Sequence, residues 1–324
     1  MCTAVSYQTE DHYFGRTLDL EYSYAEQVVV TPRRFPFSFR REETKQTHYA
    51  MIGMATVCED YPLYYEATNE AGLSMAGLNF PGYACFSSAK PEMHNVAVFE
   101  LIPWVLGQCE TVEQAALLLE KTNVTNDAFR ADMPAATLHW MLCDRTRAMT
   151  LEITQSGQHL FDNPAGVLTN NPPFDYQMTN LSNYMILSAQ PPENRFAPAL
   201  PLAPYCKGMG AMGLPGDLSS VSRFVRAAFA RCNSVAGPGE GESVNQFFHI
   251  LGTVQQPRGC AHLGGGKYEI TVYTSCCNTD KGIYYYTTYE NNTVHAVSMH
   301  KTDLDAESLF AYPLLMQDAI VPQN

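Results

Sequence analysis

The first nineteen residues constrain the fold most, because they predict that the chain opens directly into a β-sheet. Residues 2–7 and 12–18 read as strands, and Thr9-Glu10-Asp11 between them has the residue types of a turn. The sequence therefore predicts an N-terminal β-hairpin whose first strand starts at Cys2.

Cys2 is also the residue with the clearest chemical potential. A side chain this small at position 2 allows removal of the initiator methionine, which leaves Cys2 with a thiol and a free α-amino group. Unperturbed, the amine titrates near ~7.7–8.0 and the thiol near ~8.5. Near neutral pH the amine can therefore accept the thiol's proton without a histidine, a known arrangement for nucleophilic catalysis. The plainer interpretation is that position 2 merely tolerates a cysteine.

The expected pairing of the hairpin brings charged residues to Cys2. If residues 10–11 form a two-residue loop, Cys2 lies opposite Asp19, at roughly 4.5–5.5 Å between Cβ atoms. Asp19 could then stabilise the ammonium group that forms when the amine takes the proton. Strict alternation places Arg16 on the other face of the strand, unless a bulge at Gly15 re-aims it. The alternative is an exposed ion pair at a sheet edge.

Composition allows a large packed core and excludes several classes of protein. The 324 residues are 46% hydrophobic and 16% charged, enough for one large or two small domains. The N-terminus has no basic region followed by an apolar stretch, so no signal peptide is expected. No run approaches the ~18 apolar residues that a membrane span needs. A net charge of −13 argues against nucleic acid as a partner, and an anionic substrate would need a local cationic patch.

The ten cysteines do not form a recognisable pattern. There is no C-x-x-C, and the adjacent Cys276-Cys277 pair suits neither a simple disulfide nor a tetrahedral metal site. We expect most of them to be small buried residues in a reducing cytoplasm, with no bound metal.

Two asparagines stand where predicted strands end. Asn79 follows the strand at 73–78, and Asn170 follows a short strand that begins at Gly166. Each could donate a hydrogen bond to a developing oxyanion, through its amide or through the backbone N–H. The alternative for each is an ordinary turn, since Asn79 precedes Pro-Gly by one residue and Asn171-Pro172 could cap the second turn.

The remaining pattern is that of a mixed α and β protein. Further strands are expected at 26–31, 49–58, 62–67, 137–143, 148–153, 158–162, 268–275, 282–289 and 293–299. Helices are expected at 96–107, 112–121, 221–232 and 243–251. Residues 123–134 read as a loop with exposed apolar side chains, Phe129 and Met133, which suits a lid or a subunit contact. Residues 191–216, rich in Pro, Gly and Met, read as a long ordered excursion.

Two further residues have a functional and a structural interpretation. Arg223 lies in the first turn of its helix, where a cation is poorly placed against the helix dipole, so it could have another partner near Cys2. Otherwise it is a surface arginine. His139 and Cys143 share a face of one strand and could form a catalytic pair, although a buried core histidine is the simpler explanation.

Taken together, the motifs resemble those of the choloylglycine hydrolase family, within the N-terminal-nucleophile hydrolases. The matching stretches are Met1-Cys2-Thr3, Phe14-Gly15-Arg16-x-x-Asp19, Ala76-Gly77-Leu78-Asn79-Phe80-Pro81, Leu138-His139-Trp140, Leu168-Thr169-Asn170-x-Pro172, Leu214-Pro215-Gly216-Asp217 with Ser222-Arg223-Phe224, and Thr287-x-Tyr289. They occur in order and span nearly the whole chain.

The resemblance implies an α+β fold, a four-layer αββα sandwich of two antiparallel sheets, in one catalytic domain over 1–324 with the mature chain from Cys2. It implies hydrolysis of glycine- or taurine-conjugated bile salts, without a cofactor, by a cytoplasmic homotetramer in which residues 190–216 could be an assembly arm. Carried over, the catalytic residues are Cys2, Arg16, Asp19, Asn79, Asn170 and Arg223. A steroid acyl group would need a wide apolar pocket, whose walls we expect at Leu18, Phe129 and Met133. Thr17 after Arg16 and Cys58 in an expected pocket segment depart from the family pattern.

Three other functions are compatible with parts of the sequence. A penicillin V acylase uses the same chemistry with an aryloxyacetyl group, although Asn79 resembles the bile-salt branch, since the acylase branch commonly has Tyr at that position. A protein that binds an apolar ligand would leave Cys2 inert. A Cys–His protease would depend on His139.

Overall fold

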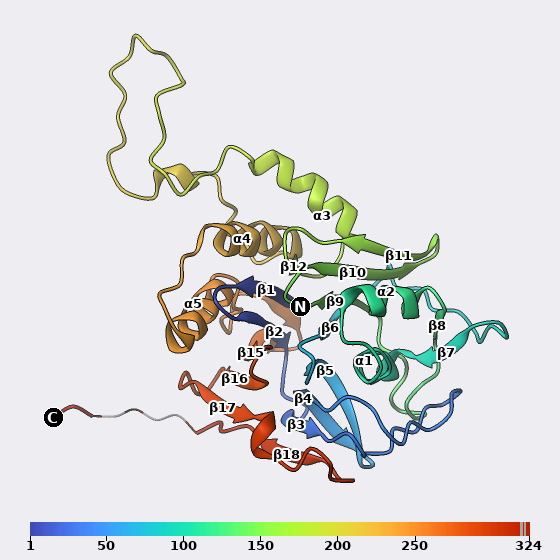
Figure 1. The fold of residues 1–324 in the computed structure, drawn as a ribbon. Coiled ribbons are helices and arrows are strands. Elements are labelled where there is room, and N and C mark those ends of the chain that lie inside the picture. The colour runs from blue at the N-terminus through green and yellow to red at the C-terminus, as the bar shows by residue number, and fades with distance from the viewer. Residues whose placement is uncertain (318–319, 321) are drawn as a thin grey trace.

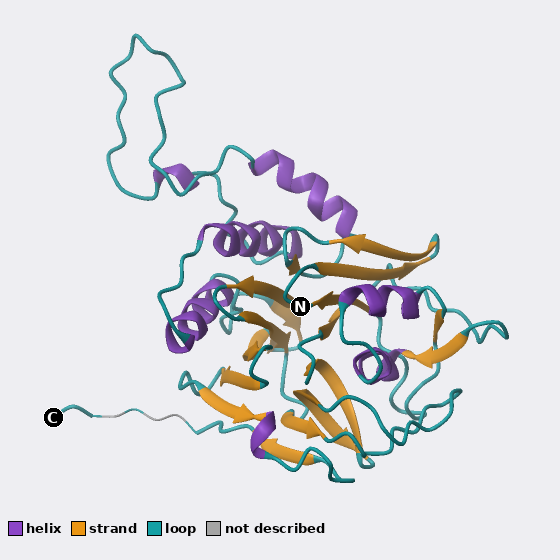
Figure 2. Ribbon diagram, viewed as in Figure 1, coloured by secondary structure: helices purple, strands orange, loops and turns teal. Residues whose placement is uncertain are grey.

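A computed structural model describes residues 1–317, 320 and 322–324 of the chain. Two large antiparallel sheets stack face to face, and helices cover the outer face of each (Figures 1 and 2). The expected α+β fold with four layers is confirmed. This arrangement buries both faces of the central strands, which is why segments such as 2–7 are apolar or uncharged throughout rather than alternating.

The N-terminal hairpin forms the middle of the six-stranded sheet. The strand order is β12 (Val167–Leu168), β1 (Cys2–Gln8), β2 (His12–Leu20), β15 (Ile270–Asn278), β16 (Ile283–Thr288) and β17 (His295–Ser298). Cys2 therefore starts a strand with hydrogen-bonded neighbours on both sides and is 2% exposed.

The eight-stranded sheet supplies the opposite wall. Its order is β11 (Gly157–Asp162), β10 (Ala148–Thr154), β9 (Leu138–Cys143), β6 (Ser74–Asn79), β5 (Tyr61–Asn69), β4 (Met51–Cys58), β3 (Gln27–Thr31) and β18 (Phe310–Pro313). Two small pairs stand apart, β7 (His94–Ala97) with β8 (Thr122–Thr125) and β13 (His262–Gly264) with β14 (Lys267–Tyr268).

The helices pack according to which sheet they cover. α4 (Ser220–Asn233) and α5 (Glu240–Gly252) lie on the six-stranded sheet, and α1 (Leu101–Leu106) packs against β5 and β6 of the other sheet, followed by α2 (Val112–Leu119). α3 (Phe174–Leu181) contacts α4. The Ser219 side chain caps α4 by accepting a hydrogen bond from the Ser222 N–H.

Three segment predictions were wrong. The helix expected at 96–107 starts only at Leu101, because the apolar run before it belongs to β7, which pairs in parallel with β8 inside the expected loop at 123–134. Helix α3 was not predicted. α5 begins at Glu240 rather than Ser243, with Gly239 as its N-cap.

The hairpin register also differs from the expected one. Gln8 pairs with His12 across a three-residue loop, so Cys2 lies opposite Leu18 and not Asp19. The loop gains its third residue because the Thr9 N–H donates to the Asp11 carbonyl at 2.9 Å. Asp19 pairs with Met1 rather than with Cys2: its N–H donates to the Met1 carbonyl at 2.9 Å.

Gly15 does not produce a bulge. It pairs in register with Val5 of β1, the register shift between β2 and β15 lies at Thr271/Tyr273, and a Cβ at Gly15 would lie 2.1 Å from the Ser275 carbonyl oxygen of β15. Glycine is therefore required here because the backbone of β15 lies too close for a Cβ. The side chains of β2 still alternate strictly between the two faces of the sheet.

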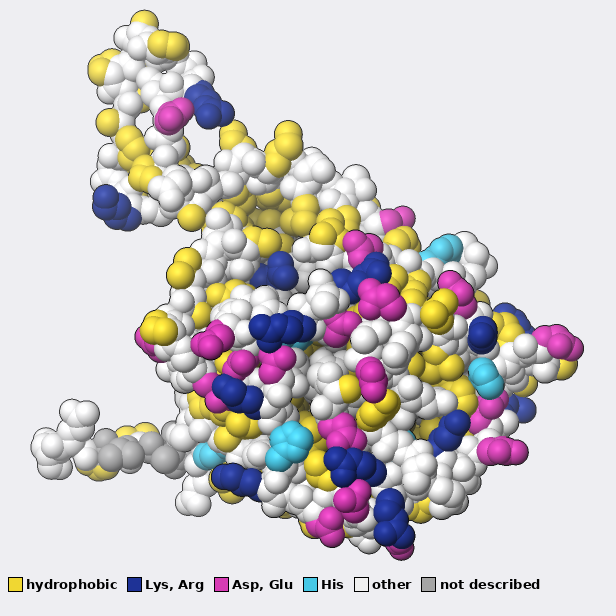
Figure 3. Space-filling model, viewed as in Figure 1, with side chains coloured by type: hydrophobic (Ala, Val, Ile, Leu, Met, Phe, Trp, Pro, Cys, Tyr) yellow, Lys and Arg dark blue, Asp and Glu magenta, His cyan; other side chains and the backbone are white. Residues whose placement is uncertain are grey.

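Residues 185–216 project from the body of the molecule as a long excursion between α3 and α4 (Figure 1). Apolar side chains line this projection (Figure 3), and the large ones among them are Met185, Ile186, Phe196, Leu200, Leu202, Tyr205 and Met212. Among the described residues, no helix has the length and apolar character needed to cross a membrane.

Candidate active site

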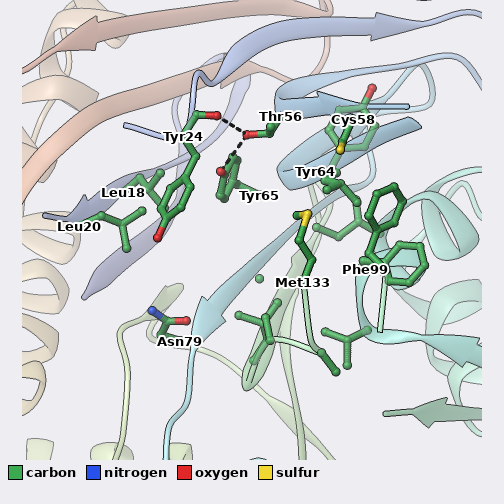
Figure 4. Close-up of a pocket in the computed structure, with 18 of the residues that line it drawn as sticks. Leu18, Leu20, Tyr24, Thr56, Cys58, Tyr64, Tyr65, Asn79, Phe99 and Met133 are labelled. Atoms are coloured by element: carbon green, nitrogen blue, oxygen red, sulfur yellow. Dashed lines mark hydrogen bonds between the residues drawn. The ribbon is translucent and has the colours of Figure 1, made fainter. Parts of the chain in front are cut away.

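Cys2 lies at the end of a large, mainly apolar cavity of about 560 Å³. The side chains that line it come from β2, β4, β5, β6, β9 and the loop at 129–136. Figure 4 shows Leu18, Leu20 and Tyr24 on one side and Tyr64 and Phe99 on the other, with Met133 between them. A cavity of this size and lining suits an extended apolar acyl group.

The three predicted wall residues all line this cavity. Leu18 lies opposite Cys2 on β2, and Phe129 and Met133 reach the cavity from the loop after β8. Sequence reasoning missed several other lining residues. Of these only Leu20 carried a signal, since it lies two positions after Leu18 on the same face of β2. The others include Tyr24, Leu63, Tyr64, Tyr65, Phe99, Ile102, Leu138 and Trp140.

Arg16 enters the site from the same face of β2 as Leu18. The pairing of β5 with β6 ends at Glu66 opposite Ala76, and the two strands diverge beyond that point. Arg16 Nη1 donates to the Gly77 carbonyl at 2.6 Å and to the Tyr65 carbonyl at 3.3 Å, one on each strand. The guanidinium therefore fills the split in the sheet. It is fully buried and lines the cavity beside Cys2.

Glu66 is the counter-charge of Arg16, and it had no signal in the sequence. Its carboxylate lies 3.8 Å from Arg16 Nε and accepts hydrogen bonds from the hydroxyls of Tyr273, Ser275 and Tyr284 on the opposite sheet. Burial raises the pKa of this carboxyl group, and Arg16 and the hydroxyls oppose that shift. Arg16 and three hydroxyl groups therefore surround the Glu66 carboxylate between the two sheets.

Asp19 approaches the nucleophile from the other face of β2. Its carboxylate accepts hydrogen bonds from Thr271 Oγ1 at 2.7 Å and from Thr17 Oγ1 at 3.1 Å. Burial raises the pKa of Asp19, while the nearby Arg223 guanidinium lowers it. Asp19 thus lies next to the chain terminus as expected, although not by direct pairing with Cys2.

The structure retains Met1, whose amine has two partners in the residues around Cys2. This amine donates to the Asp19 carbonyl at 2.6 Å and forms an ion pair with Glu269. Burial lowers its pKa. One residue further on, the Cys2 N–H donates to Asn170 Oδ1 at 2.9 Å. The terminus is therefore held by fixed partners before any residue is removed.

Arg223 connects Cys2 to Asn170. Its Nη1 donates to the Cys2 carbonyl at 2.5 Å and to Thr3 Oγ1 at 2.6 Å, and its Nη2 donates to Asn170 Oδ1 at 2.7 Å. The side chain is fully buried, so the interpretation as a surface arginine was wrong. Its direct partners are two oxygens of residues 2–3, the Asn170 amide and the Leu218 carbonyl, rather than a carboxylate.

Asn170 and Asn79 lie together at the rim of the two sheets. Asn170 Nδ2 donates to the Asn79 carbonyl at 2.8 Å, and the Ser220 hydroxyl fixes the Asn170 backbone N–H at 2.9 Å. One of the two Nδ2 hydrogens of Asn170 is thus engaged. The Asn79 side chain lines the cavity and is drawn below Leu18 and Leu20 in Figure 4. Two amide groups therefore lie close to Cys2, as oxyanion stabilisation requires.

His139 has no thiol partner. Its Nδ1 lies 2.9 Å from Glu152 Oε1 and its Nε2 lies 2.9 Å from the Thr169 carbonyl, and the residue is fully buried. A catalytic pair with Cys143 is therefore not formed, and the simpler prediction of a buried, hydrogen-bonded histidine is confirmed. Within the described part of the chain, no cluster of three or more His, Cys, Asp or Glu side chains could hold a metal ion.

Glu100 is a buried carboxyl group beside the cavity wall, and its pKa is shifted. Its carboxylate accepts hydrogen bonds from the Arg40 N–H at 2.6 Å and the Ala97 N–H at 2.9 Å, and Arg40 in turn lies over the Phe99 and Phe129 rings. Burial raises the pKa of Glu100 from 4.5 to about 7. The folded protein therefore holds a proton that the unfolded chain releases in this window.

We expect the free energy of unfolding to fall as pH rises from 4.5 to about 7, by at most about 3 kcal/mol from this group, and then to level off. Urea unfolding of the wild type and of Glu100→Gln at pH 5 and pH 8 isolates the effect. The stability of the wild type relative to the variant should decrease between the two pH values. A constant difference would show that Glu100 titrates normally.

Comparisons with known proteins agree with this geometry. Residues 2–312 match the model for linear amide C–N hydrolases of the choloylglycine hydrolase family. The chain is 49% identical over 314 residues, 97% of each chain, to a protein of Lactiplantibacillus plantarum named bile salt hydrolase/transferase. A solved conjugated bile acid hydrolase from Clostridium perfringens superimposes with a TM-score of 0.92 at 35% identity, covering 100% of both chains.

A more distant solved structure shares the fold. Penicillin V acylase from Agrobacterium tumefaciens superimposes with a TM-score of 0.77 at 20% identity, covering 96% of this chain and 90% of the other. The family match spans nearly the whole chain, and the N-terminal cysteine, the cavity and the buried polar residues around them are in place. The chain therefore belongs to the choloylglycine hydrolase family of linear amide C–N hydrolases.

Proposed function

We propose that this enzyme hydrolyses the amide bond of glycine- or taurine-conjugated bile salts, with Cys2 as the nucleophile. The observation that carries the proposal is that Cys2 is buried, donates its N–H to the Asn170 amide and lines, together with Asn79, an apolar cavity of about 560 Å³. The names of the relatives at 35–49% identity point to the same substrate class.

The proposed reaction begins once Met1 has been removed. The Cys2 amine takes the thiol's proton, and the sulfur attacks the amide carbonyl carbon. Asn79, and the Nδ2 hydrogen of Asn170 that is not bonded to the Asn79 carbonyl, donate to the oxyanion. The intermediate collapses to a thioester as glycine or taurine leaves with the proton from the amine. Water, activated by the same amine, hydrolyses the thioester and restores the Cys2 thiol.

The charged residues have complementary roles in this proposal. Arg16 lines the cavity beside Cys2 and favours the thiolate, and Asp19 on the opposite face favours the ammonium form of the amine. Arg223 holds the Cys2 carbonyl and Asn170 in one network. Burial of the amino group, which lowers the pKa of the Met1 amine in this structure, would help the Cys2 amine to act as a base near neutral pH.

Turnover of taurocholate and penicillin V by the purified protein tests the substrate class. A steroid acyl group would fill more of the long apolar cavity than an aryloxyacetyl group, so we expect kcat/KM for taurocholate to be at least ~10-fold higher. Free taurine can be measured with ninhydrin. Turnover of penicillin V alone would assign the chain to acylase chemistry, and turnover of neither would favour an apolar-ligand binding protein.

We also propose that the protein is a cytoplasmic homotetramer made of one catalytic domain. The projecting residues 185–216, with Phe196 and Tyr205 more than 80% exposed, provide an apolar arm for contacts between copies. Light scattering after gel filtration should give four times the chain mass. The double variant Phe196→Ser and Tyr205→Ser should then give smaller species, and an unchanged mass would exclude these side chains from the interface.

A further inference from the structure

His139 lies between the two segments that carry the oxyanion asparagines. On β9 it pairs with Leu78, the residue before Asn79. Its ring stacks on Phe80, the residue after Asn79, with centroids 4.2 Å apart and ring planes 7° apart. Its Nε2 lies 2.9 Å from the carbonyl of Thr169, the residue before Asn170. One buried side chain thus contacts the immediate neighbours of both asparagines.

Both ring nitrogens of His139 are hydrogen-bonded. Nε2 donates its hydrogen to the Thr169 carbonyl, and a second hydrogen lies between Nδ1 and Glu152 Oε1. Glu152 Oε1 also accepts from the Phe174 N–H at 3.0 Å. Both side chains are almost fully buried, so the pair is shielded from water.

The spacing of the two asparagines depends on these contacts. Asn170 Nδ2 bonds to the Asn79 carbonyl at 2.8 Å, and Asn170 Oδ1 accepts from the Cys2 N–H. A change in the position of Thr169 or Phe80 would therefore move the donors relative to the attacked carbonyl, where a small displacement is costly. His139 itself does not line the cavity that holds the substrate.

We propose that His139, held by its hydrogen bonds to Glu152 and the Thr169 carbonyl, is a positioning residue that fixes Asn79 and Asn170 as one oxyanion site. This inference rests on the function proposed above, because it concerns the same reaction. It predicts a larger effect on stabilisation of the oxyanion than on the nucleophile, since His139 contacts the neighbours of Asn79 and Asn170 directly and Cys2 only through Asn170.

Two measurements on the same variants separate these effects. The first is kcat and KM for taurocholate. The second is the rate at which iodoacetamide alkylates Cys2, followed by peptide mass spectrometry. Alkylation at a saturated carbon needs the thiolate but forms no oxyanion. It therefore reports on Cys2 and its surroundings without using the oxyanion site.

His139→Phe keeps the stacking on Phe80 and removes both hydrogen bonds. We expect kcat to fall about 10- to 100-fold, less than the 10²–10³-fold typical of losing a donor itself, with KM and the alkylation rate changed less than ~3-fold. His139→Gln should recover part of the loss, because its amide N–H can reach the Thr169 carbonyl. Glu152→Gln replaces the carboxyl group that shares a hydrogen with His139 Nδ1 by an amide and weakens that bond, so its kcat should also fall.

His249→Gln is the matched control, since His249 is an exposed residue of α5 on the six-stranded sheet. It should leave both rates unchanged. The proposal is overturned if His139→Phe retains wild-type kcat, or if its kcat and alkylation rate fall together with its melting temperature. The two proposals fail separately: wild-type inactivity on taurocholate counts against the function, whereas the ratio of variant to wild-type kcat, on taurocholate or penicillin V, decides the role of His139.

Discussion

Cys2→Ala is expected to abolish amide hydrolysis, with kcat lowered by about 10⁶-fold, as for the loss of a nucleophile in other enzymes. The amide side chains, the cavity and the buried arginines all remain, so binding of the substrate should persist. The physical reason is that no other thiol stands beside these donors. The other cavity thiol, Cys58, lies on β4 and accepts a hydrogen bond from Arg130 at 3.4 Å.

Taurine release and equilibrium binding of taurocholate measure the two halves of this expectation. Cys232→Ala, which removes an exposed thiol on α4, is the control and should turn over normally. An alanine variant that still hydrolyses taurocholate at more than 1% of the wild-type rate, roughly ten thousand times the residual expected above, would remove Cys2 from the chemistry. Loss of binding together with turnover would indicate a damaged cavity instead.

A residue retained in front of Cys2 should also lower turnover strongly, although less than the loss of the thiol. Inserting leucine between Met1 and Cys2 prevents trimming, so the nitrogen of Cys2 stays an amide and cannot accept a proton. Loss of a general base costs about 10²–10⁴-fold. The added residue would also have to fit into the space where the Met1 amine contacts Asp19 and Glu269.

Intact-mass measurement and taurocholate turnover on the same sample test this prediction. The unmodified chain, expressed in parallel, should show the mass that begins at Cys2 and full activity. Full activity in a sample whose mass includes the extra leucine would mean that the base is another group. The amine would then have no part in the reaction.

Local pattern predicted most of the strands and the residues that meet at the site. The two short runs of strand-forming residues at β1 and β2 and the turn residues between them were sufficient to predict the hairpin. The register was wrong by one residue because a backbone bond between Thr9 and Asp11 adds a residue to the loop, and loop length cannot be read from composition. The apolar run before α1 was assigned to a helix because a short apolar segment fits either structure.

The surroundings of Arg16 show why other parts could not be predicted. Its role depends on the divergence of β5 and β6, whose free carbonyls on Tyr65 and Gly77 accept its hydrogen bonds. Glu66, its counter-charge, reads in the sequence as one acidic residue of an exposed strand. It is buried only because the second sheet brings three hydroxyls to it.

The sequence by itself determined the nucleophile, its amine and the two asparagines, because each is set by its place at a terminus or at the end of a strand. Only the tertiary structure decided which groups surround them. Arg223 meets the Cys2 carbonyl across 221 positions of sequence, and His139 meets the Thr169 carbonyl from a different strand. Such contacts arise from the stacking of two sheets and the helix on one of them, and no local pattern of residues encodes that stacking.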